Sequence, residues 1–337
     1  MLDSFNQTID EVVYGPQNSG VSEGIIKGEN SYEKFLLPTP GVDHPSIGTN
    51  DYAQYQKSVD LINNLRVTEI MYSPIGGSDY EFIELSNLGD TTLSLNGVSF
   101  NEGIEFVFDD LALLPNDSIV LVSNLEAFIS RYGNVTDLIY QYEGKLNNAG
   151  ERIVIQLPDP FPFKIINFSF QDQWFEETDG RGYSLVLNNR EAEQIDYGSR
   201  ESWTLGSYLG SPNGRSIHES YADWSANHDN QGPLVDHDGD GLINGFEYVL
   251  GEDSKAVNQI MSPQYDREKN MFYWEISRRL VANDYSVILE SSDNLVNWER
   301  LSVFESTIGP LSEMIRIVQP SNLIKEFYRL RLDKKVP

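Results

Sequence analysis

The chain has 337 residues, no cysteine, and a net charge of −28 from 52 acidic and 24 basic residues. This length allows two or three domains, each with its own core, and the lack of cysteine excludes disulfides, thiolate nucleophiles and cysteine zinc sites. Because nucleic-acid binding requires positive charge opposite the phosphates, the acidic composition argues against a DNA or RNA partner. No apolar run approaches the roughly twenty residues of a bilayer span, so no membrane span is expected in this chain.

Residues 1–45 have the weakest pattern. A short strand pattern at 9–15 resembles a later phrase at 194–198, which indicates the terminal strands of a preceding copy of the next domain. A disordered polar leader explains the same composition, so both interpretations stay open. Residues 46–63 contain no strand pattern and are expected to form a linker with a helical turn near 52–61. The N-terminus lacks a basic, hydrophobic leader, so an export signal is expected outside this chain.

Residues 64–215 are predicted to form one β-sandwich. Short runs rich in β-branched and aromatic residues are separated by Gly, Asp and Asn turns. Strands that follow one another in this way, with few helices between them, pack as two sheets. The nine expected strands are 66–72, 81–85, 93–100, 105–108, 118–122, 151–157, 165–170, 184–187 and 193–197.

One helix is predicted within this β region. Ser123 and Glu126 have the spacing of a capping box, apolar residues follow at helical spacing, and Gly133 is a stop signal. We expect this helix to cover an open end of the sandwich.

The order of phrases over residues 64 to about 215 resembles a bacterial lamin tail domain. The phrases are VTEIMYSP, DYEFIELSNLGDTTLSLNGVSF, LLPNDSIVLVSNLEAFISRYG, NNAGERIVIQLPD, DGRGYSLVLNN and WTLGSYLGSPNGR. The resemblance implies an immunoglobulin-like β-sandwich that serves adhesion or spacing in large secreted or surface proteins, without an activity of its own. The ending Ser211-Pro212-Asn213 departs from the usual Thr-Pro-Gly, which affects only the final turn.

The segment DHDGDGLINGFE, residues 236–247, has the pattern of a calcium loop. Calcium takes about six to eight oxygen ligands, and a loop of about twelve residues supplies them from alternate positions. Gly241 lies where the backbone must turn sharply, a conformation that glycine adopts at little cost. The alternative is a solvated acidic turn, but every ligand position is filled. The predicted ligands are Asp236, Asp238, Asp240, the Leu242 carbonyl, Asn244 and a bidentate Glu247.

Residues 216–258 are predicted to form a calcium-binding spacer around this loop. The preceding stretch, 225–235, is polar and contains a Gly-Pro break, which argues against the incoming helix of a paired EF-hand. A short exit helix follows over 242–250, with Gly251 as its stop. The unit resembles the single-loop calcium repeats of dockerins and thrombospondin-like spacers, which implies weak, extracellular-range affinity of about 0.1–1 mM.

Residues 259–337 are predicted to form a small antiparallel β domain. The phrases SVILESSDNLVNWERLSVF and EFYRLRL resemble the C-terminal modules of secreted bacterial multidomain proteins. Period-two alternation indicates strands at 271–276, 285–290, 314–318 and 327–332.

The acidic residues Glu69, Glu81 and Glu84 are the best candidates for a catalytic acid and base. Glu81 and Glu84 point to opposite faces of one strand, so they are poor partners, and the lamin-tail resemblance gives Glu84 a structural hydrogen-bonding role. The four histidines lie in polar stretches, where a solvated side chain is the expected state. No hydrolase, nucleotide-binding or zinc-protease motif is present. We therefore expect no catalytic residues and no enzyme.

The combined pattern favours a non-catalytic, calcium-binding structural or adhesion module of a secreted or cell-surface bacterial multidomain protein. Calcium would fix the angle between the two β domains, and the partner would be a protein or polysaccharide surface. The alternative is a carbohydrate-binding accessory region of an extracellular hydrolase, in which exposed aromatic side chains stack on sugars. The candidate rings for that alternative are those of the 18 tyrosines and of Trp174, Trp203, Trp224, Trp274 and Trp298.

Overall fold

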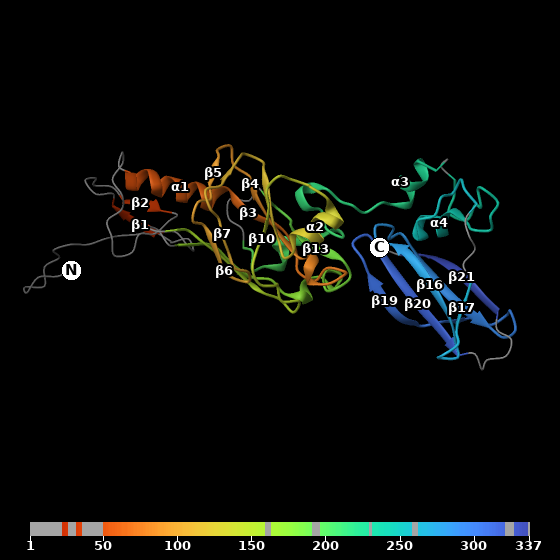
Figure 1. Ribbon diagram of the computed structural model, residues 1–337. Coiled ribbons are helices and arrows are strands. Elements are labelled where there is room, and N and C mark those ends of the chain that lie inside the picture. Colours follow the sequence, from red (N-terminus) through yellow and green to blue (C-terminus); the bar gives the residue numbers. More distant parts are fainter. Residues whose placement is uncertain are drawn as a thin grey trace, which may run out of the picture.

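A computed structural model describes residues 22–25, 32–35, 50–158, 163–190, 196–228, 231–257, 262–320 and 327–335. The described chain is mainly β, as expected, with strands in antiparallel sheets and a few helices (Figure 1). Among the described residues, none of the helices has the length and apolar character that a bilayer span requires. Most of the predicted residues 1–45, the predicted strand at 193–197 except for its end, and His44 lie outside the described residues.

The predicted sandwich region contains two main sheets that face each other. All neighbouring strands are antiparallel except β9 and β10, which run parallel. The six-stranded sheet has the order β10 (Ile139–Gln141), β9 (Ser118–Val122), β4 (Phe82–Asn87), β3 (Leu65–Met71), β13 (Tyr183–Leu187) and β14 (Trp203–Tyr208). The four-stranded sheet has the order β12 (Lys164–Ser169), β11 (Arg152–Gln156), β6 (Ser99–Glu102) and β7 (Phe106–Val107).

Smaller elements complete this region. Two small two-stranded sheets pair β1 (Ser22–Ile25) with β2 (Tyr32–Phe35), ahead of the sandwich, and β5 (Leu93–Ser94) with β8 (Ala112–Leu113). Short 3-10 helices lie at Ser78–Tyr80, Asp172–Trp174, Glu176–Thr178, Arg200–Ser202 and Pro212–Gly214.

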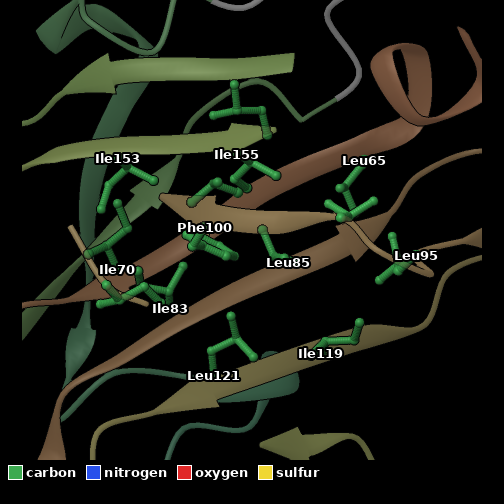
Figure 2. Packing of buried hydrophobic residues seen from close by; sticks show 14 of the residues in the cluster. Leu65, Ile70, Ile83, Leu85, Leu95, Phe100, Ile119, Leu121, Ile153 and Ile155 are labelled. Carbon is green, nitrogen blue, oxygen red and sulfur yellow. The ribbon is translucent and has the colours of Figure 1, made fainter. Parts of the chain in front are cut away.

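One large hydrophobic core fills the space between the two main sheets. Strand alternation places every second side chain of β3, β4 and β9 on the inner face, where residues such as Ile83 and Leu85 have no exposed surface. Phe100 of β6 and Ile155 of β11 meet them from the opposite sheet (Figure 2). Burial of an aliphatic side chain of this size contributes roughly 1.5–3 kcal/mol, so this core is the main stabilising element of the region.

The helix α2 (Leu125–Tyr132) forms where it was predicted, but its start and its place differ from expectation. Asn124 is its N-cap and accepts a hydrogen bond from Ala127 N (3.1 Å), so Ser123 is not the capping residue. Gly133 ends the helix as predicted. Phe128 packs against Phe82 in a second cluster on the outer face of the six-stranded sheet. The helix therefore covers a sheet face and not an open end of the sandwich.

A longer helix precedes the sandwich. The helix α1 (Asn50–Asn64) runs through most of the predicted linker, where the sequence had indicated only a helical turn. Tyr55 and Leu61 are buried in the main core, which explains why this weakly amphipathic segment is helical.

The C-terminal part contains two further sheets, and the predicted strands at 271–276, 285–290, 314–318 and 327–332 all form (Figure 1). One sheet has the order β15 (Gln264–Asp266), β16 (Met271–Arg279), β20 (Ser312–Pro320) and β19 (Val303–Ile308). The other has the order β18 (Glu299–Arg300), β17 (Tyr285–Ser292) and β21 (Phe327–Lys334). We call these two sheets the C-terminal β unit.

Two short helices, α3 (Tyr221–Ala226) and α4 (Asn244–Leu250), lie between the sandwich and the C-terminal β unit in sequence. They pack on each other, α4 packs on β16 and β17, and Tyr221 of α3 contacts Tyr285 of β17, so both helices share a core with the C-terminal β unit.

The sandwich and the C-terminal β unit also touch directly. Leu209, at the end of the sandwich, is buried with Leu280, which follows β16. Arg131 of α2 donates from Nε to the carbonyl of Pro310 (2.9 Å) and from Nη1 to the carbonyl of Ile75 (2.8 Å). This contact of the two β regions does not involve the predicted calcium loop.

Candidate calcium site

Hydrogen bonds from its own backbone wind the segment 236–247 into a tight loop. Asp236 accepts from Gly239 N (2.8 Å) and from Gly241 N (3.0 Å). Asp240 accepts from Leu242 N (2.7 Å). Gly241 has a φ of +98°, in the region that side chains with a Cβ rarely adopt. The glycine predicted from the loop pattern is therefore required by its backbone geometry.

The winding brings three carboxylates to one centre. One oxygen each of Asp236, Asp238 and Asp240 lies within 4.8 Å of the other two. Two oxygens that both contact a calcium ion at about 2.3–2.6 Å can be at most about 5 Å apart. The spacing therefore allows all three aspartates to contact one ion.

The fourth carboxylate comes from the helix α4. Glu247 has no exposed surface and lies close enough to the three aspartates to feel their charge. Asn244 is equally buried, and with its amide assigned so that the nitrogen faces the two neighbouring acceptors, that nitrogen donates to Glu247 Oε2 (3.2 Å) and to the Val235 carbonyl (2.9 Å). Asn244 thus orients Glu247, and at its loop position a ligand often acts through a water molecule. The Leu242 carbonyl stays a predicted ligand.

The electrostatics of the loop indicate that a bound cation would stabilise it. Burial, followed by the negative charges of Asp238, Asp240 and Asp236, raises the pKa of Glu247 to about 7. The carboxylate form of Glu247 is therefore disfavoured beside three others. A divalent cation at their common centre would remove both the repulsion and the desolvation penalty.

One unpartnered atom provides the test of whether calcium fits. Asp238 Oδ2 is buried and has no hydrogen-bond partner among the described residues, whereas Asp238 Oδ1 accepts from Asp240 N (3.1 Å). A buried carboxylate oxygen without a donor is costly. The remaining ligands are all oxygens, which suit a hard cation. The residues present therefore fit calcium.

The segment before the loop differs from expectation in one respect. The sequence predicted no helix over 225–235, and the described residues from 227 to 235 contain none, but the short unpredicted helix α3 precedes them and ends at Ala226. Ser220 caps it by accepting from Asp223 N (3.1 Å). Ser220 followed by Asp223 is a local capping signal that sequence reasoning could have used.

Buried acidic residues outside the loop have structural partners. Glu69 accepts from Ser184 Oγ (2.6 Å) and Ser211 N (2.8 Å), and Glu84 accepts from Thr68 Oγ1 (2.5 Å) and Asn213 N (2.5 Å). They fasten the turn after β14 to the sheet, in line with the structural role predicted for Glu84.

The sequence missed the pairing of Glu69 with Glu84. These residues lie directly opposite each other on β3 and β4, and a hairpin register for those two strands would have revealed it. Burial raises the pKa of Glu69 to about 7, and the charge of Glu84 adds to this effect.

Glu81 lies apart from that pair, as alternation predicted. Its Oε2 accepts from Leu146 N (2.9 Å) and from the Tyr142 hydroxyl (3.1 Å), and burial raises its pKa to about 7. These partners hold a loop against the start of β4.

The five tryptophans do not form one platform. Trp203, Trp224 and Trp274 are buried in three different hydrophobic clusters. Trp174 and Trp298 are half-buried, and the guanidinium of Arg329 lies 4.1 Å from the Trp298 ring centre. Among the tryptophans, the carbohydrate-binding alternative therefore retains only these two separated, partly covered rings.

The histidines are also dispersed. His228 stacks on Trp224 with ring centres 4.1 Å apart and contacts the carbonyl of that residue through Nδ1 (2.7 Å). His218 lies 3.5 Å from Asp284, and His237 belongs to the calcium loop.

Comparisons with family models, with curated proteins and with solved structures find no match to this chain. The resemblances to a lamin tail domain and to dockerin-type loops therefore remain predictions from the residues quoted above.

Proposed function

We propose that this chain is a non-catalytic, calcium-binding structural module of a secreted or cell-surface multidomain protein. The observation that supports it best is the loop at 236–247. Three aspartate carboxylates share one centre within 4.8 Å, and the buried Glu247 approaches them from α4. A solvated acidic turn has no reason to bury its last carboxylate and to leave an aspartate oxygen without a donor.

Calcium is the cation that this ligand set favours. Calcium tolerates irregular geometry with a mixture of carboxylate, carbonyl and water ligands, whereas magnesium demands near-octahedral geometry and retains several waters. The chain offers no thiolate, so softer metals gain no preferred ligand. A single loop of this kind matches affinities of about 0.1–1 mM, which suit the calcium concentrations outside cells. We therefore propose that the module functions outside the cell.

The same proposal includes the type of β-sandwich and the type of calcium loop. The six-stranded and four-stranded sheets face each other around one core, as in an immunoglobulin-like sandwich of the lamin-tail type. The loop with its exit helix α4 supports the dockerin-like interpretation. The module would act as a rigid spacer that presents a protein-binding or polysaccharide-binding surface.

Titration calorimetry with calcium on the intact chain tests this proposal. Wild-type protein should bind one calcium ion, and Asp236→Ala should abolish measurable binding. Glu252→Ala is the matched control, because Glu252 is an exposed acid close to the loop but outside the ligand set. Magnesium at the same concentration should displace little calcium. Equal calcium binding by wild type and Asp236→Ala would refute the site.

A further inference from the structure

The helix α4 connects the loop to the hydrophobic core of the C-terminal β unit. Asn244 and Glu247, two of the proposed ligand positions, lie on this short helix. Its remaining turn contains Tyr248 and Val249, which are 0% and 1% exposed, and Leu250, which is also buried. Any change in the order of the loop must therefore reach residues that form the core.

The core residues of α4 join both C-terminal sheets. Leu250 is buried in one cluster with Trp274 and Ile276 of β16, Leu289 of β17 and Ile317 of β20. These strands belong to different sheets, so Leu250 lies where the two sheets meet. Removal of the helix would expose this contact to water.

A glycine shows how closely α4 is seated. A Cβ added at Gly245 would collide with the side chain of Leu332 on β21 and would lie 2.9 Å from the Pro233 carbonyl. The helix is therefore in direct contact with the three-stranded sheet and with the segment before the loop.

The start of α4 is held by the segment that leads directly into the loop, because Asn244 N and Gly245 N donate to the carbonyls of Val235 (2.8 Å) and Pro233 (2.9 Å). Its N-cap residue, Ile243, has no side chain that accepts a hydrogen bond from the helix N-terminus. Without a cation, Glu247 is buried next to three aspartates that repel it. Small β units of roughly 70–80 residues commonly require a staple such as a bound metal. In this molecule the loop is positioned to provide it.

We propose that calcium is a folding ligand of the C-terminal β unit, which it stabilises through α4, while the sandwich at 64–215 folds independently of calcium. The inference depends on the calcium site proposed above. It assigns the ion a role within one unit, because no described residue of 231–257 belongs to the two hydrophobic clusters of the sandwich. The metal thereby controls whether the C-terminal unit is rigid.

Hydrogen exchange followed by mass spectrometry tests this inference on the intact chain, with calcium in excess or with a calcium chelator. Removal of calcium should accelerate exchange at least ten-fold in β16, β17 and β21 and leave β3, β4 and β11 unchanged. Calorimetry on the same sample establishes whether calcium binds. If it does not bind, the proposed function fails. If it binds while exchange in the C-terminal strands is unchanged, the calcium site stands and this inference is overturned.

Linkage provides a second test, since coupling between two sites acts equally in both directions. Ile276→Ala, in the C-terminal core but outside the loop, should weaken calcium affinity at least three-fold. Ile155→Ala, the same change in the sandwich core, should leave the affinity unaltered. The milder pair Ile276→Val and Ile155→Val serves if an alanine variant does not fold. Equal affinities in both members of a pair would contradict the coupling.

Discussion

The sandwich and the C-terminal β unit are both built from antiparallel strands, yet they are stabilised by different means. The sandwich has one large core whose inner residues, such as Leu85 and Leu121, have no exposed surface. The C-terminal β unit has smaller clusters, completed by a helix from outside its strands. The charge differs too, because residues 259–337 contain eleven basic and eleven acidic residues, so the net charge of −28 arises entirely within residues 1–258. A core of sufficient size is self-supporting, whereas a small one requires a staple.

The largest effect is expected from a truncation in the sandwich core. Leu121→Ala removes a fully buried side chain between the two main sheets and should lower the free energy of unfolding of the sandwich by about 2–5 kcal/mol. Hydrogen exchange of β3, β4 and β11 at increasing denaturant concentration measures this change in the free energy of unfolding. Strands β16, β17 and β21 should be unaffected, and an equal loss in both regions would mean that they fold as one unit.

The next largest effect is expected in how the stability of the sandwich depends on pH. The pKa of Glu69 rises from 4.5 in the unfolded chain to about 7 in the fold, chiefly through burial. A raised carboxyl pKa stabilises the folded state fully below about pH 4.5 and loses this contribution as pH rises to about 7. We expect a loss on the order of 3 kcal/mol over this range from Glu69.

Thermal denaturation of wild type and Glu69→Gln between pH 4.5 and 7.5 measures this contribution. The variant should show a smaller decline with pH, and Glu126→Gln, an exposed residue of α2, is the control. The same decline in Glu69→Gln and wild type would show that Glu69 does not titrate in this range.

A smaller effect should come from the cap of α2. Asn124→Ala removes the side-chain oxygen that accepts from Ala127 N and should destabilise the sandwich by about 1 kcal/mol. Ser123→Ala, at the cap position expected from the sequence, should cost less. Chemical denaturation of both variants decides between the two residues, and a larger cost at Ser123 would contradict the assignment. The start of α4 has no such side-chain cap, and its first N–H groups donate instead to the carbonyls of Val235 and Pro233.

The smallest effect is expected for an ion pair on the C-terminal sheet. Arg316 of β20 pairs with Glu275 of β16 and lies near Glu305, and all three side chains are at least one-third exposed. Exposed pairs contribute little to stability, so Arg316→Gln should shift the C-terminal transition only slightly in calorimetry, and less in high salt. A loss comparable to calcium removal would mean that ion pairs, and not α4, hold this unit.

The sequence alone predicted the local features of this protein. Period-two alternation identified most strands, because side-chain direction along a strand is independent of distant residues. The helix stops at Gly133 and Gly251 followed from glycine's access to positive φ. The loop at 236–247 was recognisable because its proposed ligands are close in sequence. The carboxylate cluster that forms there is therefore a local property.

Tertiary structure decided the features that join distant residues. The sequence had treated 216–258 as a spacer, but α4 contributes core residues to the β unit that follows. It placed α2 at an open end, whereas apolar residues on the outer face of β4 and β9 are buried beneath the helix. It also missed that Glu69 and Glu84 are neighbours, because strand register depends on the whole hairpin. Hydrophobic burial selects these contacts by surface area, and the area available at each position is known only once the chain has folded.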